Sequence, residues 1–268
     1  MPRAESPVPP VLELDRISLV RDERTILDRV TWTVTPGQRW VVLGANGSGK
    51  TSLIRIASLY LHPSRGEVRV LGGRLGEVDV RTLRRRIGIA SAALAAEFRT
   101  DLTALNIVMT AKNAALEPWW HRYDDDDRAR ARACLDRFGV GSFADRSLGT
   151  LSSGEQQRVM LARSVMTDPG IVLLDEPSAR LDLGGREHLV GALADMAADP
   201  QAAPFVLVTH HVDEIPPGIT HALLLRDGRV LAAGALDATL TADRISECFG
   251  MPLHLERRAN GRFSAWAR

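Results

Sequence analysis

The stretch from Val41 to Ala57 reads VVLGANGSGKTSLIRIA and passes from an apolar run, through a glycine-rich turn, into a helical pattern. Its middle, Gly44–Thr51, fits the pattern G-x-x-x-x-G-K-[ST] of a phosphate-binding loop. Glycines allow backbone N–H groups to turn inward, where side chains would clash. Those groups and the N-terminus of the following helix hold phosphate oxygens. The stretch therefore predicts a strand, a phosphate loop and a helix of an α/β fold.

The phosphate loop also supplies two side chains with chemical roles. Lys50 is expected to reach the β- and γ-phosphates of a nucleotide, and Thr51 is expected to offer its hydroxyl to Mg²⁺. The whole predicted nucleotide-binding segment comprises Gly44, Ala45, Asn46, Gly47, Ser48, Gly49, Lys50, Thr51 and Ser52. Kinases, GTPases and helicases share these features, so the loop alone leaves the class open.

A second apolar run, Ile171–Leu174, ends in Asp175-Glu176-Pro177. Four consecutive apolar residues suit a parallel strand that is buried on both faces. Asp175 would then lie at the carboxyl end of the strand, where open α/β sheets bind ligands, and it could hold Mg²⁺ directly or through water. Glu176 could polarise an attacking water as a general base. The alternative, an acidic pair that only caps a helix, is disfavoured by the phosphate loop in the same chain.

The third motif, LSSGE at 151–155, reads as the start of a helix. Two serines and a glycine there suit an anion site, while Ser152 and Glu155 also have the spacing of a capping box. Farther along, Asp182 follows the acidic pair, and Thr209-His210 ends another apolar run, Phe205–Val208.

In this order the motifs resemble those of the ATP-binding cassette (ABC) ATPases, over about Leu12–Arg229. The family's signature is usually written LSGGQ, and LSSGE departs from it at Ser153 and Glu155. The resemblance implies that the signature of one cassette caps the γ-phosphate held by the phosphate loop of another. It therefore implies ATP as the substrate, Mg²⁺ as the cofactor, and a second cassette as a partner in a two-fold dimer, most simply a homodimer. The implied signature residues are Ser152, Ser153, Gly154 and Glu155.

The resemblance also assigns roles near the acidic pair. It implies that Glu176 is the catalytic base and that Lys50 and His210 act with it, His210 as the switch histidine that positions water and the γ-phosphate. Asp182 would belong to the segment that links the two ATP sites of the dimer. His211 is expected to be exposed, since its use as the switch would need a shift of one residue.

Two positions depart from the family pattern. Ala92 stands where these proteins usually carry a glutamine that contacts Mg²⁺ and relays the ATP state, and Ser91 or Glu97 could take its place. Arg21 stands where an aromatic side chain usually stacks on the adenine. A guanidinium can also stack on a purine; the alternative is that Arg21 is exposed and the adenine loosely held.

The resemblance implies a P-loop NTPase core with a mostly parallel sheet, an N-terminal antiparallel β subdomain and an inserted α-helical lobe. We expect one domain over residues 1–268. Its ATP-binding core would comprise 11–92 and 166–235, its helical lobe with the signature 93–165, and a short C-terminal extension 236–268.

Local patterns predict further details. Asp124–Asp127 is expected to start a helix, because acidic residues suit its N-terminus. The pair Trp119-Trp120 is expected to pack into the core of the lobe rather than to face a partner. Arg84–Arg86 is expected at an exposed end of a helix or strand. His221–Leu225 and Val230–Ala233 read as two strands around a turn.

Composition narrows the function. The net charge of +1 makes nucleic acid an unlikely partner. The chain has no apolar stretch long enough for a transmembrane segment of its own, and MPRAESPVPP does not read as a signal peptide. The spacing of Cys134 and Cys248 argues against a disulfide framework and a zinc site. We expect a cytoplasmic protein that can lie peripherally on the inner face of the cell membrane.

The leading interpretation is the ATPase subunit of an ABC transporter that drives a separate membrane permease. The alternatives are a soluble cassette acting on nucleic acid or the ribosome, and an accessory ATPase in cofactor assembly. Ala92 adds weight to the first of these alternatives, because the missing glutamine is tied to permease coupling. The VTHHVDEIP segment and the tail FGMPL are similar to the molybdate-transport-associated and photorepair-type cassettes, a short match that indicates no substrate.

Overall fold

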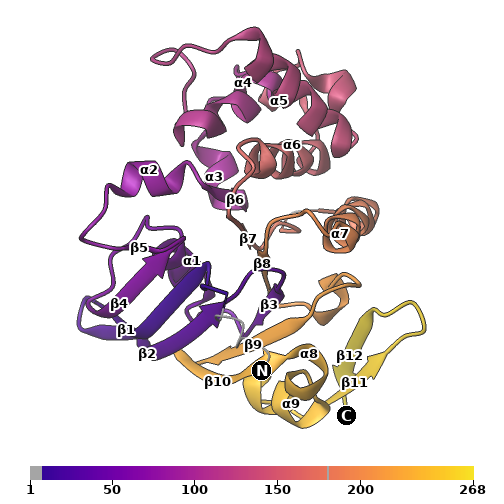
Figure 1. The fold of residues 1–268 in the computed structure, drawn as a ribbon. Helices are drawn as coiled ribbons and strands as arrows, with labels where there is room; N and C mark the ends of the chain where they lie inside the picture. The colour runs from indigo at the N-terminus through magenta and orange to yellow at the C-terminus, as the bar shows by residue number, and fades with distance from the viewer. Residues whose placement is uncertain (1–7, 180) are drawn as a thin grey trace, which may run out of the picture.

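The computed structural model describes residues 8–179 and 181–268; the first seven residues, part of the stretch that does not read as a signal peptide, and Arg180 lie outside this description. Two sheets and a helical lobe make up most of the fold, with a small hairpin near the C-terminus (Figure 1). This arrangement confirms the predicted α/β fold with an antiparallel β subdomain and a mostly parallel sheet.

The antiparallel sheet has the strand order β2-β1-β4-β5. Along β1, buried side chains are separated by more exposed ones. The buried side chains, which face the core, are Leu12, Leu14, Ile17 and Leu19. This pattern suits a sheet that has one face on the core. The strands are β1 (Leu12–Arg21), β2 (Arg24–Val34), β4 (Arg65–Val70) and β5 (Gly73–Arg74).

The larger sheet has the strand order β10-β9-β3-β8-β7-β6 and is parallel except for β10, which pairs antiparallel with β9. The apolar run that the sequence assigns to a buried parallel strand is β7, and the predicted pair of strands around a turn is β9 and β10. The strands are β3 (Arg39–Leu43), β6 (Ile87–Ser91), β7 (Ile171–Asp175), β8 (Phe205–Thr209), β9 (His221–Arg226) and β10 (Arg229–Ala235).

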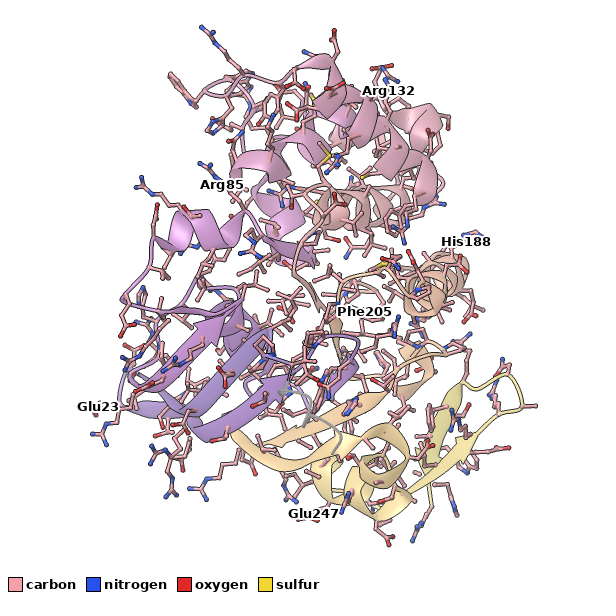
Figure 2. The ribbon with its side chains drawn as sticks, in the orientation of Figure 1. Glu23, Arg85, Arg132, His188, Phe205 and Glu247 are labelled. Atoms are coloured by element: carbon pink, nitrogen blue, oxygen red, sulfur yellow. The ribbon has the colours of Figure 1, made fainter. Side chains whose placement is uncertain are left out.

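Helices cover both faces of the larger sheet. Val41 and Leu43 of β3 belong to one hydrophobic cluster, which also contains the lobe, whereas Trp40 and Val42 belong to another, shared with the antiparallel sheet. Phe205 of β8 lies fully buried in the middle of the molecule (Figure 2). Besides the helices at the top of the molecule described next, the chain forms α1 (Lys50–Ala57), α2 (Val80–Arg84), α3 (Ala92–Glu97), α7 (Leu183–Ala198), α8 (Leu236–Thr239) and α9 (Ala242–Phe249).

The helical lobe forms around three helices that lie together at the top of Figure 1. Asp124 caps the second of them and Asp127 completes the capping box, so the acidic run starts a helix as predicted. The lobe contains α4 (Ala104–Met109), the 3₁₀ turn η1 (Thr110–Asn113), α5 (Asp125–Arg137), the turns η2 (Gly141–Phe143) and η3 (Leu148–Thr150), and α6 (Ser153–Val165).

The predicted packing of Trp119 and Trp120 into the core of the lobe is wrong. Their side chains are 55% and 85% exposed. Side chains such as Ile107 and Leu135 already fill the interior between α4 and α5, so the turn between η1 and α5 that carries both tryptophans stays outside. Trp119 instead lies under the guanidinium of Arg99, 4.8 Å from ring centroid to Cζ.

The remaining segments are short. Arg84 ends α2, and Arg85 and Arg86 are exposed, as predicted. A further 3₁₀ turn, η4 (Val212–Glu214), follows β8, and the chain ends in an antiparallel hairpin of β11 (Leu253–Arg257) and β12 (Phe263–Ala267). Across residues 8–179 and 181–268, no helix is both long and apolar enough to cross a bilayer.

Candidate functional site

The phosphate loop connects β3 to α1 and requires its glycines. Gly47 and Gly49 have φ angles of 82° and 101°, which L-residues with a Cβ rarely adopt. A Cβ on Gly44 would lie 2.3 Å from the carbonyl oxygen of Leu225, and one on Gly49 would lie 2.7 Å from Cδ2 of Leu27. The sequence therefore folds into a tight loop whose backbone lies directly against β9 and β2.

Lys50 is the first residue of α1 and its side chain is only 4% exposed. Its ammonium donates hydrogen bonds to the carbonyl oxygens of Gly44 at 2.8 Å and Ala45 at 3.1 Å. It also lies 3.6 Å from Oε1 of Glu176. Because a buried charge needs partners, these contacts fix the ammonium over the loop.

Thr51 and Asp175 place two side-chain oxygens, which could act as metal ligands, beside Lys50. The Thr51 hydroxyl donates to Oδ1 of Asp175 at 3.5 Å. The pKa of the Asp175 carboxyl is raised to about 6, chiefly by burial; the Thr51 hydrogen bond and the Lys50 charge oppose this rise, and the Glu176 charge adds to it. The described residues contain no cluster of three or more His, Cys, Asp or Glu side chains that could hold a metal ion. The pair fits Mg²⁺, which is commonly bound by one or two protein oxygens together with phosphates and water.

Glu176 and His210 come from the ends of two neighbouring parallel strands, β7 and β8. Nδ1 of His210 lies 3.2 Å from Oε1 of Glu176. The backbone of Glu176 has a φ of 47°, in the left-handed region, and its N–H donates to the carbonyl oxygen of Val208 at 3.0 Å. His211 is exposed, as predicted. Thus Lys50, Asp175, Glu176 and His210 lie together at one edge of the sheet.

The LSSGE segment begins α6. The Ser152 hydroxyl accepts the N–H of Glu155 at 3.3 Å, and the Glu155 carboxylate accepts the N–H of Ser152 at 2.7 Å. The backbone hydrogen bond from Ser152 lowers the pKa of Glu155. Ser152 and Ser153 are exposed, and Gly154 is partly exposed. In Figure 1 α6 belongs to the lobe, whereas α1 lies beside the antiparallel sheet, so one chain does not bring the signature onto its own phosphate loop.

Three more predicted residues lie outside this cluster. Asp182 caps α7, and its carboxylate accepts the N–H of Gly185 at 2.7 Å. Arg21 is the exposed last residue of β1 and pairs with Arg24 across the tight turn to β2. Ser52 is partly buried in the first turn of α1.

Ala92 begins the short helix α3, and Ser91 caps that helix by accepting the N–H of Leu94 at 3.0 Å. A serine before AALAAE is a helix-start signal that sequence reasoning did not use. Ala92 lines a hollow of about 150 Å³ together with Ser153. Ser91 and Glu97, in contrast, line a second hollow of about 170 Å³ with Thr51 and Asp175.

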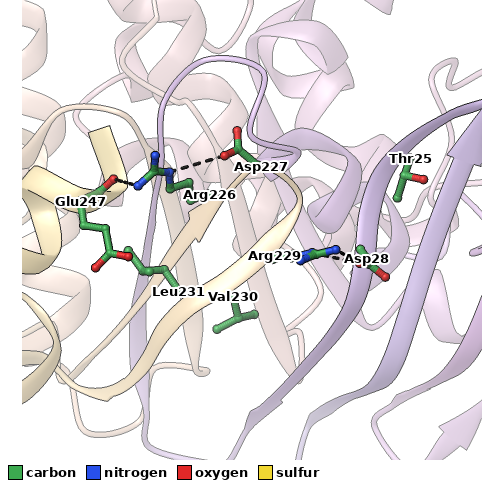
Figure 3. Close-up of a pocket in the computed structure, with 8 residues that line it drawn as sticks. All are labelled: Thr25, Asp28, Arg226, Asp227, Arg229, Val230, Leu231 and Glu247. Carbon is green, nitrogen blue, oxygen red and sulfur yellow. Dashed lines mark hydrogen bonds and ion pairs between the residues drawn. The ribbon is translucent and has the colours of Figure 1, made fainter. Parts of the chain in front are cut away.

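A charged groove of about 670 Å³ lies between β2, the turn that joins β9 to β10, and α9 (Figure 3). Nη2 of Arg229 lies 2.6 Å from a carboxylate oxygen of Asp28, and Arg226 donates to the backbone oxygen of Glu247 at 2.6 Å. These contacts tie β10 to β2 and α9 to β9. The lining residues are Thr25, Asp28, Arg226, Asp227, Arg229, Val230, Leu231 and Glu247.

Comparison with known proteins identifies the family of the chain. The family profile described as ABC transporter matches residues 27–179. The chain is 36% identical to the uncharacterized ABC transporter ATP-binding protein YlmA of Bacillus subtilis (strain 168), over 91% of this chain and 93% of that protein. It is 35% identical to the lipoprotein-releasing system ATP-binding protein LolD of Chromohalobacter salexigens, over 69% of this chain and 77% of that one.

Solved structures show the same fold. The dimeric structure of MJ0796, a bacterial ABC transporter cassette, superposes with a TM-score of 0.72 and 25% identity, covering 84% of this chain and 98% of that chain.

Proposed function

The chain belongs to the family of ABC transporter ATP-binding proteins, and we propose that it hydrolyses ATP with Mg²⁺ as one half of a dimer that drives a separate membrane permease. The observation that carries the proposal is the cluster of Lys50, Thr51, Asp175, Glu176 and His210 at the carboxyl edge of the parallel sheet.

The proposed reaction is attack of water on the γ-phosphate. Lys50 would offset the charge of the β- and γ-phosphates, while Thr51 and Asp175 would hold Mg²⁺, which supplies further neutralisation of that charge. Glu176 would accept the proton of the attacking water. Because one ring nitrogen of His210 faces Glu176 at 3.2 Å, the other is left to contact the phosphate or the water.

The remaining nucleotide contacts are proposed for the loop itself. Gly44–Ser52 would wrap the phosphates, as its inward-turned glycines suggest. Arg21 would lie against the adenine, because a guanidinium can stack on a purine face.

The dimer is proposed because Ser152 and Ser153 of the signature are exposed and α6 lies away from the phosphate loop of the same chain. Ser152, Ser153, Gly154 and Glu155 of one copy would cap the ATP held by the other, and Asp182 would link the two sites. The similarity to a dimeric cassette supports this arrangement. ATP would then close the dimer interface, because it would bind the closed dimer more tightly than the open one. Hydrolysis would remove that preference and reopen the interface.

The permease is proposed from the relatives, which include subunits named for lipoprotein release and for zinc transport. We place the chain in the cytoplasm, on the inner face of the membrane. We also propose one domain with a core of 11–92 and 166–235, a lobe of 93–165 and an extension of 236–268.

Two measurements test the proposal. Purified protein should release phosphate from ATP in the presence of Mg²⁺, and the Lys50→Ala variant should not, because it lacks the charge that meets the phosphates. Tagged Glu176→Gln protein, held with ATP and Mg²⁺, should then capture a multi-span membrane protein from detergent-solubilised membranes. Capture of ribosomes, nucleic acid or soluble proteins alone would overturn the transport part and leave the ATPase part standing.

A further inference from the structure

A hydrogen bond between two side chains joins the ends of the short segment 209–214, which carries His210. Thr209, the last residue of β8, and Glu214, in η4, are 1% and 4% exposed. The Thr209 hydroxyl donates to Oε2 of Glu214 and accepts the N–H of His211 at 3.0 Å. His210 therefore lies in a small ring that Thr209 and Glu214 close, and its backbone cannot move without disturbing these contacts.

The same ring is fixed to α7 by Arg186. Nε of Arg186 lies 3.6 Å from Oε1 of Glu214, and Nη1 donates to Oδ2 of Asp213 at 3.3 Å. The first contact places a positive charge beside the buried Glu214 carboxylate, which would otherwise be costly to bury. The N–H of Arg186 also donates to the carbonyl oxygen of Asp182 at 3.0 Å. Arg186 thus connects the His210 segment to the first turn of the helix that Asp182 caps.

The C-terminal hairpin reaches the same place. Arg262, just before β12, donates to the carboxylate of Glu187 on α7 and to the backbone oxygen of Asp213 at 2.5 Å. The next residue, Phe263, is buried in the main hydrophobic cluster. The guanidinium of Arg262 is therefore held by a packed hairpin and bridges α7 to η4.

We propose that Glu214 is a positioning residue for His210, held in place by Arg186 and by the bridge from Arg262. The inference rests on the proposed role of His210 in ATP hydrolysis. None of these side chains needs to touch ATP: Glu214 acts on the ring that contains His210, and α7 acts on Glu214. The network thereby joins the helix begun by Asp182 to the histidine within one chain.

The test uses Thr209→Val, which keeps the shape of the side chain but removes the hydroxyl, and Thr209→Ser, which keeps the hydroxyl. We expect Thr209→Val to lower kcat about 10- to 100-fold, as small displacements of catalytic groups do. The Kd for ATP should stay within about twofold, and Thr209→Ser should retain near wild-type kcat. Equal kcat in Thr209→Val and wild type would overturn the proposal.

A second readout does not depend on hydrolysis. With ¹³C-labelled histidine, the ring resonance of His210, assigned among the seven histidines by its loss in His210→Ala, should move in Thr209→Val and stay in Thr209→Ser. Arg262→Met should move it as well; methionine keeps most of the apolar stem of this side chain, which is 18% exposed, so the variant should fold. A resonance unmoved in both Thr209→Val and Arg262→Met would overturn the proposal.

The matched control is Arg132→Gln, which removes an exposed ion pair to Asp145 on the lobe. It should leave both kcat and the His210 resonance unchanged. If the wild-type protein failed to hydrolyse ATP, the proposed function would be wrong, yet the resonance shifts would still decide whether Glu214 positions His210.

Discussion

The hydroxyl of Thr51 lies 3.5 Å from a carboxylate oxygen of Asp175, although 124 positions separate the two residues in the sequence. Thr51 comes from the helix that follows β3, and Asp175 ends β7. The sheet order puts only β8 between these strands. Two oxygens that could hold one Mg²⁺ thus meet because parallel strands present their carboxyl ends at one edge.

Asp175→Asn should weaken the effect of Mg²⁺ on ATP binding by about tenfold or more, equivalent to at least about 1.4 kcal/mol of binding free energy. The reason is the loss of a negative charge that holds the ion. Calorimetric titration of ATP with and without Mg²⁺ measures it. Thr51→Val should act in the same direction and Thr51→Ser should not; a wild-type response in Asp175→Asn would refute the metal assignment.

Glu176→Gln should retain ATP binding and lower the hydrolysis rate by about 10²–10⁴, the usual contribution of a general base. His210→Ala should also lose activity, because its ring nitrogen faces Glu176. The exposed neighbour supplies the control, since His211→Ala should keep most of the rate. A steady-state phosphate-release assay on the three variants decides the matter. Loss of activity in His211→Ala but not in His210→Ala would mean that His211, and not His210, is the switch histidine.

Two helices in the described part of the chain begin with a capping box of the same kind, one at Ser152 of the signature helix and one at Asp124 of α5. Ser152→Ala and Asp124→Ala should each lower the free energy of unfolding by about 0.5–2 kcal/mol. Only Ser152→Ala should lower ATP hydrolysis, since only that helix start is proposed to meet the partner's ATP. Urea unfolding and phosphate release, measured on both variants, separate the two effects. An equal loss of hydrolysis in both would mean that Ser152 acts through stability alone.

Burial raises the pKa of the Cys248 thiol to about 11 and also raises that of Cys134. A raised pKa keeps the thiol protonated, and the thiolate is the reactive form. At pH 8 a thiol with a pKa near 11 is ionised to about one part in a thousand. Iodoacetamide should therefore label Cys248 slowly at pH 8 and faster as the pH rises toward 11. Peptide mass spectrometry checks this, with urea-unfolded protein as the control; labelling of native Cys248 at the unfolded rate would contradict it.

The sequence predicted those features that local chemistry determines. The glycines of the phosphate loop, the apolar run of β7 and the acidic start of α5 each act through neighbours a few residues away. Sequence reasoning placed all three correctly.

Features that depend on how distant segments fill space were missed. The exposure of Trp119 and Trp120 follows from a lobe interior that other helices already fill. The network around Glu214 requires the C-terminal hairpin to fold back so that Arg262 reaches Asp213, and nothing in the spacing of these residues indicates it. The HHVDE run did contain Glu214, but a glutamate after a strand gives no sign that its side chain turns back to Thr209.

The left-handed backbone of Glu176, with its φ of 47°, has a consequence for evolution and engineering. An L-residue in this conformation costs about 1–2 kcal/mol relative to a relaxed backbone, and that deficit lies at the very carboxylate proposed to activate water. Glycine would relieve the backbone and asparagine would tolerate it, yet neither can accept the proton. Selection for heat resistance alone should therefore enrich such replacements at position 176. The resulting proteins should be more stable but unable to hydrolyse ATP, because stability and activity favour different residues at this position.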